Sequence, residues 1–416
     1  MRTIITILAP ITLGYFFSLG NASATASARE KAGKSAFVTQ VSQAPSVEAA
    51  RLRVEAARAR VGASGKFPNP QVEAMAARAN NDMQGSWPKW EIQLQQPLPK
   101  AGERAADRER AIAAVAMAVA DYEIMASEMA AESAMTLAEA DAANARAVLL
   151  DEQVTRINRV LASVEARIAS GQGRAADRLA LQSRAASMRL MAEKERRMAA
   201  DAADTLRSLL GLGPEQSLPA FAVPQLERVF QATVPAARLA AAKAAEAAAM
   251  AKMAKASANP MTAIGLQASR EEMPSDTEDM VGIAFMMEIP WHSRRYARAD
   301  EMAAVADGAA ARAEGTAAEQ RAISAVTRAQ RAQRLAETAR RLAAETRARL
   351  DAEYEALVRA TATTSGMTGE SSVLMILEIL EKQADAQIQV IDAEAAMRSA
   401  QAELWKFSGP GTFPNP

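Results

Sequence analysis

The segment EIQLQQPLPKAGERAAD, residues 91–107, decides the fold because the chain contains a second, diverged copy of it. The copy, AFMMEIPWHSRRYARAD, occupies residues 284–300. In both segments apolar and polar residues alternate as in a β-strand, and a proline, Pro97 or Pro290, ends the alternation. Basic residues then lead into alanine-rich sequence that is typical of helices. The sequence thus predicts two strand-to-helix junctions nearly two hundred residues apart.

Further pairs of similar segments at almost the same spacing indicate an internal duplication. Residues 47–70 are echoed by 234–260, and ADTLRSLLG at 203–211 is echoed by QAELWKFSG at 401–409. Each repeat reads as a short helix, two strands and two long helices. The predicted organisation is a first repeat at 46–211, an inter-repeat segment at 212–233, a second repeat at 234–409 and a free C-terminal tail at 410–416.

The long helices are predicted from alanine-rich sequence with apolar residues every three or four positions, which is a coiled-coil pattern. Residues 103–169 contain no proline or glycine, so one helix of about 100 Å is expected there. Glycine-containing segments at 170–174 and 363–371 break the pattern and predict hairpin tips. The predicted long helices span about 103–169, 175–210, 297–362 and 371–407.

The predicted strands are short and have two different faces. They span about 70–79, 89–97, 261–268 and 280–289, with polar loops expected at 80–89 and 269–279. One face is apolar and carries Ile92, Leu94, Ile283 and Phe285, whereas the other carries Gln93, Gln95 and Glu288. Strands of this kind match a membrane β-barrel with a water-filled lumen. Two ordinary hairpins on a soluble helical protein are the alternative, and a barrel would need several copies because four strands cannot close one.

Aromatic residues lie near both ends of the predicted strands, where barrels carry aromatic girdles. Trp87 and Trp90 are expected at one end, and Phe67 and Trp291 at the other.

Composition excludes several classes of function. The 49 basic and 49 acidic residues cancel, so no overall field attracts nucleic acid. The chain has no cysteine, which excludes disulfides, thiolate metal sites and a cysteine-linked lipid anchor. Its one histidine, His292, cannot build a multi-histidine metal site, and no catalytic fingerprint is present. We therefore expect no enzyme, no cofactor and no metal site, and interpret the 21 methionines as packing residues.

The N-terminus is typical of an exported protein. Arg2 precedes an apolar run and a small-residue region ending near Ala28, which predicts a signal peptide at 1–28. A membrane anchor is the alternative interpretation. Residues 29–45 are expected to be a flexible N-terminal segment.

Taken together, these segments resemble the TolC family of outer-membrane efflux proteins. The resemblance rests on PNPQVE, PLPKAGERAADRERA, LRSLLGLG and LWKFSG, in this order and within a duplication. GASGKFPNP and WEIQLQQPLPKAGER are similar to the heavy-metal efflux subgroup. The family implies a mainly α fold with a small β part. It also implies a homotrimer with a helical periplasmic tunnel and one twelve-stranded outer-membrane barrel, to which each subunit gives four strands.

The resemblance also implies partners and sites. Such channels are passive exit ducts that work with a periplasmic adaptor and an inner-membrane pump, here expected to be of the resistance-nodulation-division type. The tips would contact the adaptor through Gly171, Gly173, Gly366 and Gly369. Asp177 and Glu378 match acidic residues that line the periplasmic aperture, although Met375 occupies the position equivalent to Asp177. Ordinary helix-start charges are the alternative for both carboxylates.

A second function remains open from the residues alone. A secreted periplasmic coiled coil, structural or an adaptor of an export system, would also contain long helical hairpins. Adaptors carry one hairpin per chain among many short strands, so two hairpins and four predicted strands favour the channel.

Overall fold

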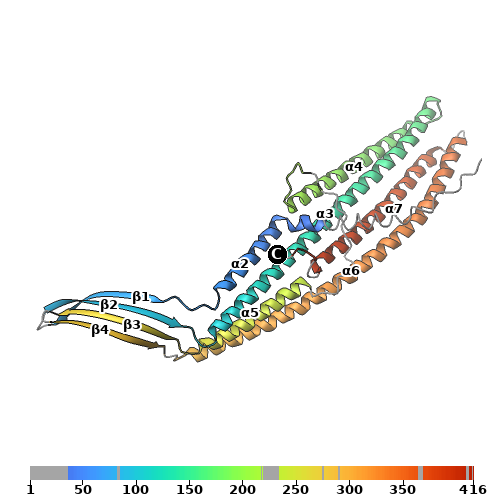
Figure 1. Cartoon of the computed structure of the whole chain (residues 1–416). Coiled ribbons are helices and arrows are strands. Elements are labelled where there is room, and N and C mark those ends of the chain that lie inside the picture. Colours follow the sequence, from blue (N-terminus) through green and yellow to red (C-terminus); the bar gives the residue numbers. More distant parts are fainter. Residues whose placement is uncertain are drawn as a thin grey trace, which may run out of the picture. The chain divides into compact units, whose positions relative to one another are not determined.

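A computed structural model describes residues 36–81, 85–216, 218, 234–273, 276–288, 291–363, 369–408, 412–414 and 416. Its helices are α2 (Pro45–Ala63), α3 (Glu103–Ala169), α4 (Ala175–Leu209), α5 (Pro235–Ser257), α6 (Ser293–Thr363) and α7 (Gly369–Glu403), followed by the 3₁₀ helix η1 (Leu404–Phe407). Its strands are β1 (Gln71–Asn81), β2 (Gly85–Leu98), β3 (Thr262–Met273) and β4 (Asp276–Met287). The predicted mainly α fold with a small β part is confirmed, and Figure 1 shows its elements.

The strands form one antiparallel sheet in the order β1-β2-β3-β4, so the two repeats meet at the β2–β3 pair. The strands are longer than predicted, because pairing continues through Lys89↔Glu271 and Arg270↔Asp279. Much of the polar sequence expected as loops at 80–89 and 269–279 is therefore strand. Charged side chains are compatible with a ladder when both faces are open, and polarity alone does not mark a turn.

The two helices that follow the β1–β2 hairpin, α3 and α4, end in the same way. At the end of α3, Gly171 has φ +79°, and the Gln172 N–H donates to the Arg167 carbonyl at 2.9 Å. At the end of α4, Gly211 has φ +68°, and the Leu212 N–H donates to the Arg207 carbonyl at 2.8 Å. Both are Schellman caps, in which glycine adopts the left-handed conformation that terminates the helix.

The described residues of 1–44, 132–227 and 339–402 form one compact unit, and those of 45–131, 228–338 and 403–416 form another. The core of the first unit joins α3, α4 and α7. Ile157, Leu181 and Leu380 in this core are fully buried. Burying each such side chain stabilises the unit by about 1.5–3 kcal/mol.

In the second unit, small residues let α5 and α6 pack closely. A Cβ on Gly315 would lie 3.3 Å from the Ala240 Cβ, and one on Gly308 would lie 3.5 Å from the Ala247 Cβ. A smaller core beside them contains Val234, Ala237, Ala318 and Ala322. Alanine and glycine therefore replace large side chains as the packing residues of this helix pair.

Two predicted terminal segments differ from expectation. Residues 36–42 are helical, and Phe37 and Val41 are buried, so the flexible segment expected at 29–45 is wrong for this part. Of the tail expected to be free at 410–416, the described residues 412–414 are docked, since Phe413 is buried and packs against Trp405. Both segments bury aromatic or β-branched side chains, and the free energy gained from this burial stabilises an ordered conformation despite their loop-like composition.

Several predictions lie outside the described residues: the signal peptide at 1–28, most of the inter-repeat segment at 212–233, and Gly366. Within the described part of the chain, every helix is too short or too polar to cross a membrane.

Candidate functional site

One face of the sheet is apolar across all four strands. The register places Leu94 beside Val72 and Leu266, and Leu266 beside Ile283. Ile92 and Phe285 lie on this same face. Its large side chains are exposed: Val72, Trp90, Ile92, Leu94, Ile264, Leu266, Val281, Ile283, Phe285 and Met287. A continuous exposed apolar surface of this kind marks a membrane or partner contact.

The opposite face is mainly polar. Gln93 pairs with Gln267, whose amide donates to the Glu91 carboxylate at 2.6 Å. Gln95 lies on this face beside Gly265. Glu288 continues the polar alternation just beyond β4, and its N–H donates to the Met261 carbonyl at 2.9 Å. The predicted apolar and polar residues therefore lie on opposite faces, which is the arrangement that a sheet between lipid and water requires.

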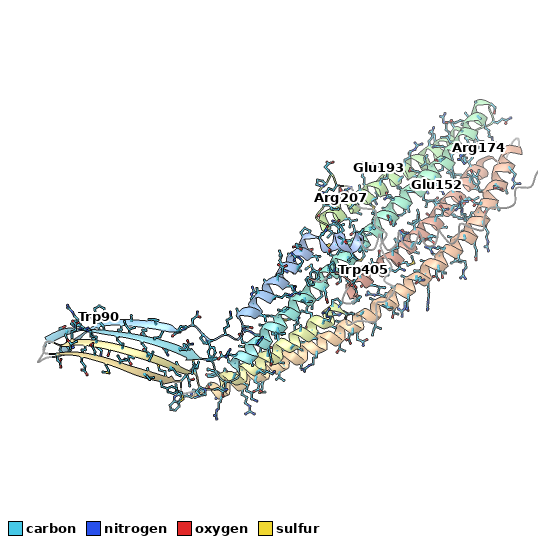
Figure 2. All side chains as sticks on the ribbon, in the orientation of Figure 1. Trp90, Glu152, Arg174, Glu193, Arg207 and Trp405 are labelled. Atoms are coloured by element: carbon cyan, nitrogen blue, oxygen red, sulfur yellow. The ribbon has the colours of Figure 1, made fainter. Side chains whose placement is uncertain are left out.

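The two tryptophans predicted as a girdle lie on different faces. Trp90, labelled in Figure 2, is 55% exposed on the apolar face. Trp87 is buried on the polar face, where its indole N–H donates to Glu271 at 2.7 Å. Only Trp90 is thus placed as an interfacial residue, because strand parity sends the odd-numbered Trp87 to the other side.

Arg104, a basic residue of the segment 91–107, stabilises the first strand-to-helix junction. The Arg104 guanidinium lies 4.2 Å from the centre of the Phe67 ring and donates to the Gly65 carbonyl at 2.7 Å. The Gly65 N–H donates to Asp107 at 2.9 Å. Gly65 has φ +66°, and a Cβ there would meet the Arg104 carbonyl at 3.0 Å. This glycine therefore permits both the turn and the close approach of α2 to α3.

A second set of contacts joins the two repeats at the base of the sheet. The Lys100 ammonium donates to the Ser257 carbonyl at 3.1 Å and lies 3.8 Å from the Glu288 carboxylate. The Asn259 amide donates to the Ala101 carbonyl at 3.1 Å. Lys100 belongs to the first repeat and Glu288 to the second, and the sequence alone does not indicate that they pair.

The first hairpin tip is built on two glycines with different roles. Gly171 has open space around its missing Cβ and is needed for its positive φ. A Cβ on Gly173 would lie 2.6 Å from the Ile168 backbone nitrogen, so Gly173 is needed for close approach. Arg174 follows as the N-cap residue of α4 (Figure 2). In the second repeat, Gly369 is the first residue of α7.

The two predicted aperture carboxylates lie near the starts of α4 and α7. Asp177 is in the first turn of α4 and half-exposed. Glu378 is exposed and pairs with Lys382 at 2.7 Å, and the hydrogen bond from this ammonium lowers the pKa of Glu378. No hydrogen bond or ion pair joins Asp177 to Glu378 within the described chain. Among all residues that the structure describes, no group of three histidine, cysteine, aspartate or glutamate side chains could hold a metal ion.

Comparison with known proteins identifies relatives of this fold. Residues 40–212 match the family model of outer membrane efflux proteins. No curated protein sequence matches the chain. A membrane protein from Pseudomonas aeruginosa is 20% identical with a TM-score of 0.71, and the alignment covers 91% of both chains.

Two further solved structures share the fold. The outer membrane protein VceC from Vibrio cholerae is 16% identical with a TM-score of 0.72, over 92% of this chain and 97% of VceC. The open state of the MtrE outer membrane channel from Neisseria gonorrhoeae is 16% identical with a TM-score of 0.73, over 92% of this chain and 89% of MtrE.

Proposed function

We propose that the chain is the outer-membrane exit duct of a tripartite efflux system, because residues 40–212 match the family model of outer membrane efflux proteins. Substrates would pass from a periplasmic adaptor and an inner-membrane pump through its lumen to the outside. The duct itself is passive and not an enzyme, and the pump supplies the energy.

The two-faced sheet carries this proposal. Ten large apolar side chains are exposed on one face, while the other carries glutamines and glutamates together with three exposed methionines, Met75, Met280 and Met286. Lipid would cover the face with Ile92, Leu94, Ile283 and Phe285, and water the face with Gln93, Gln95 and Glu288. The soluble-hairpin interpretation would leave the whole apolar face in water, which is unfavourable.

We also propose assembly as a homotrimer, which the unpaired edges of the sheet support. Within the described chain, β1 and β4 each pair on one side only, and a four-stranded sheet cannot close. Three copies of four strands give twelve, enough for a membrane barrel. The helices also expose apolar side chains that a neighbouring copy would cover: Leu179, Leu190, Met191 and Met198 on α4, and Met302, Val305, Ile323, Leu335 and Leu342 on α6.

A pair of matched variants tests the membrane orientation. Arginine at Ile283 should destabilise barrel insertion by about 2–4 kcal/mol, because it would place a charge against lipid. Arginine at Gln95, on the opposite face, should be tolerated. The measurement is the yield of heat-resistant trimer in the outer-membrane fraction. Equal loss from both variants would contradict the orientation, and a soluble periplasmic wild-type product would support the alternative coiled-coil structural or adaptor protein.

For the periplasmic end, we propose that Asp177 and Glu378 form rings of carboxylates at the aperture and that Gly171, Gly173, Gly366 and Gly369 belong to the adaptor-docking tips. Lys382 partly neutralises Glu378, so Asp177 should contribute more to cation preference. Replacing both carboxylates with alanine should raise single-channel conductance in planar bilayers. Unchanged conductance and ion selectivity would remove them from the aperture.

The pump type and cargo class are further parts of the proposal. The resemblance of GASGKFPNP to the heavy-metal subgroup suggests a resistance-nodulation-division pump. Co-purification with adaptors and pumps encoded beside the gene tests this, and restored resistance of a channel-deficient strain to metal salts or to drugs would identify the cargo class.

A further inference from the structure

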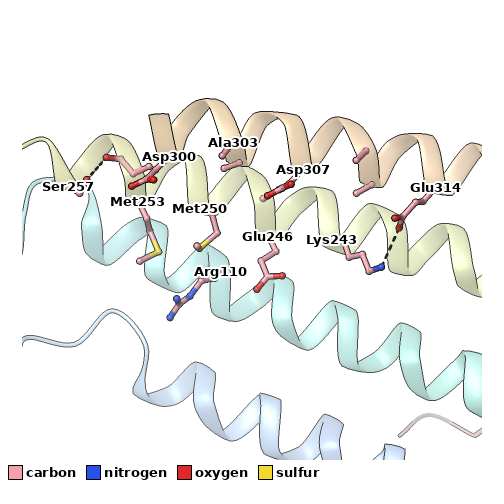
Figure 3. A pocket seen from close by; sticks show the side chains of 15 residues that line it. Arg110, Lys243, Glu246, Met250, Met253, Ser257, Asp300, Ala303, Asp307 and Glu314 are labelled. Carbon is pink, nitrogen blue, oxygen red and sulfur yellow. Dashed lines mark hydrogen bonds and ion pairs between the residues drawn. The ribbon is translucent and has the colours of Figure 1, made fainter. Parts of the chain in front are cut away.

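A groove of about 910 Å³ runs between α5 and α6, with Arg110 of α3 at its side (Figure 3). Sites for drug-sized ligands have volumes of roughly 300–1,000 Å³, so the groove is large enough for one. It lies on helices rather than on the sheet and is separate from the hairpin tips.

The walls of the groove are apolar at their centre. Met250 and Met253 project from α5 between Arg110 and the carboxylates of α6 (Figure 3). Four alanines of α6, among them Ala303 and Ala304, line the groove between the carboxylates of that helix. Thioethers are polarisable and conformationally adaptable, so they can accommodate flat or irregular apolar groups.

The charges of the groove do not balance. Lys243 lies 3.3 Å from Glu314, and Arg110 lies 3.1 Å from Asp107, so both basic side chains already have acidic partners. Three other carboxylates line the groove and form no ion pair within the described chain: Glu246, Asp300 and Asp307. An excess of negative charge therefore surrounds the apolar walls.

We propose that this groove binds a lipophilic organic cation. The thioethers and alanines would contact its apolar body, and Glu246, Asp300 and Asp307 would attract its positive charge. A bare metal ion is a poorer match, because no three potential ligands converge in the described chain. The role of this site in contacting exported cargo rests on the proposed duct function. The binding of an organic cation to the groove does not depend on that function.

Tetraphenylphosphonium is a suitable probe, since it is a permanent cation with an apolar surface. Isothermal titration calorimetry of the purified full chain in detergent should detect binding that weakens with added salt. The neutral triphenylphosphine oxide should bind more weakly. A variant combining Glu246→Gln, Asp300→Asn and Asp307→Asn should lose about tenfold or more in affinity for the cation.

Glu319→Gln is the matched control, because Glu319 is an exposed carboxylate on α6 that does not line the groove. It should leave the affinity unchanged. Met250→Ala should weaken both probes, whereas the charge variant should affect only the cation. The proposal is overturned if the wild type does not bind tetraphenylphosphonium, or if Glu319→Gln and the triple variant lose affinity equally.

Single-channel conductance separates this inference from the proposed function. The triple variant should still form heat-resistant trimers and conduct, which also shows that it folds. Absence of conductance in the wild type, with binding intact, would contradict the duct and leave the cation site standing. Conductance without binding would contradict the site alone.

Discussion

The docked C-terminal tail should stabilise the protein measurably. Phe413 is 8% exposed, and its ring centre lies 6.3 Å from that of the buried Trp405. The Tyr122 hydroxyl donates to the Pro414 carbonyl at 3.0 Å, and Arg58 donates to a backbone oxygen of Pro416 at 2.8 Å. These contacts connect the tail to α2, α3 and η1, so removing one of them should weaken the others.

The magnitudes follow from burial. Phe→Ala at a fully buried site costs about 3–5 kcal/mol, and Phe413→Ala should fall at the lower end because the tail can relax. Tyr122→Phe removes one hydrogen bond to an exposed carbonyl and should cost about 1 kcal/mol. Once Phe413→Ala has undocked the tail, Tyr122→Phe should cost almost nothing more. The double variant should therefore be more stable than additivity predicts by about 1 kcal/mol.

The assay is urea unfolding of the purified protein in detergent, analysed as a double-mutant cycle. Tyr296→Phe serves as the control, since Tyr296 is 69% exposed and its loss of a hydroxyl should have no effect. Fully additive effects of Tyr122→Phe and Phe413→Ala would refute the reasoning, because the two contacts would then be independent. A negligible effect of Phe413→Ala would show that the tail is not docked.

Other predictions concern the tip, the core and pH. Gly173→Ala should lower the free energy of unfolding by about 1–3 kcal/mol, measured by thermal unfolding, through its clash with the Ile168 backbone, whereas Gly171→Asn should be milder because asparagine tolerates positive φ. Leu380→Ala should cost about 2–5 kcal/mol in urea unfolding, and the exposed Leu374→Ala on the same helix under 0.5 kcal/mol. Burial raises the pKa of the Tyr122 phenol above its usual value of about 10. The protonated phenol therefore contributes fully to the stability of the fold below pH ~10, and this contribution is lost as the pH rises through the raised pKa. Tyr122→Phe should flatten the loss of stability in that alkaline range.

Much of the architecture could be predicted because it repeats with a regular period. The absence of proline and glycine from 103–169 predicts one helix, and the structure forms it as α3. Alternation in two separate segments also placed Ile92 and Ile283 on a common face, which the register confirms. Periodicity indicates which residues share one face of a helix or strand. In a sheet, paired residues on neighbouring strands also point to the same face.

The strand ends were less predictable, because the signal there is weak. Charged residues such as Glu271 and Asp279 resemble loop sequence, yet their backbones remain in the ladder. Where both faces of a sheet are largely open, few buried side chains mark the end of a strand, so the boundary is defined mainly by the turn itself.

Contacts between distant segments could not be predicted from the residues alone. Tyr122 and Pro414 are 292 positions apart, and Lys100 approaches both Ser257 and Glu288 in the other repeat. The tail resembles a free segment because three of the seven residues at 410–416 are prolines. Proline lacks an N–H but retains its backbone oxygen, and the hydrogen bonds from Arg58 of α2 and Tyr122 of α3 both end on backbone oxygens of prolines. A proline-rich tail can thus be a good acceptor for Arg58 and Tyr122, with little conformational entropy to lose when it docks.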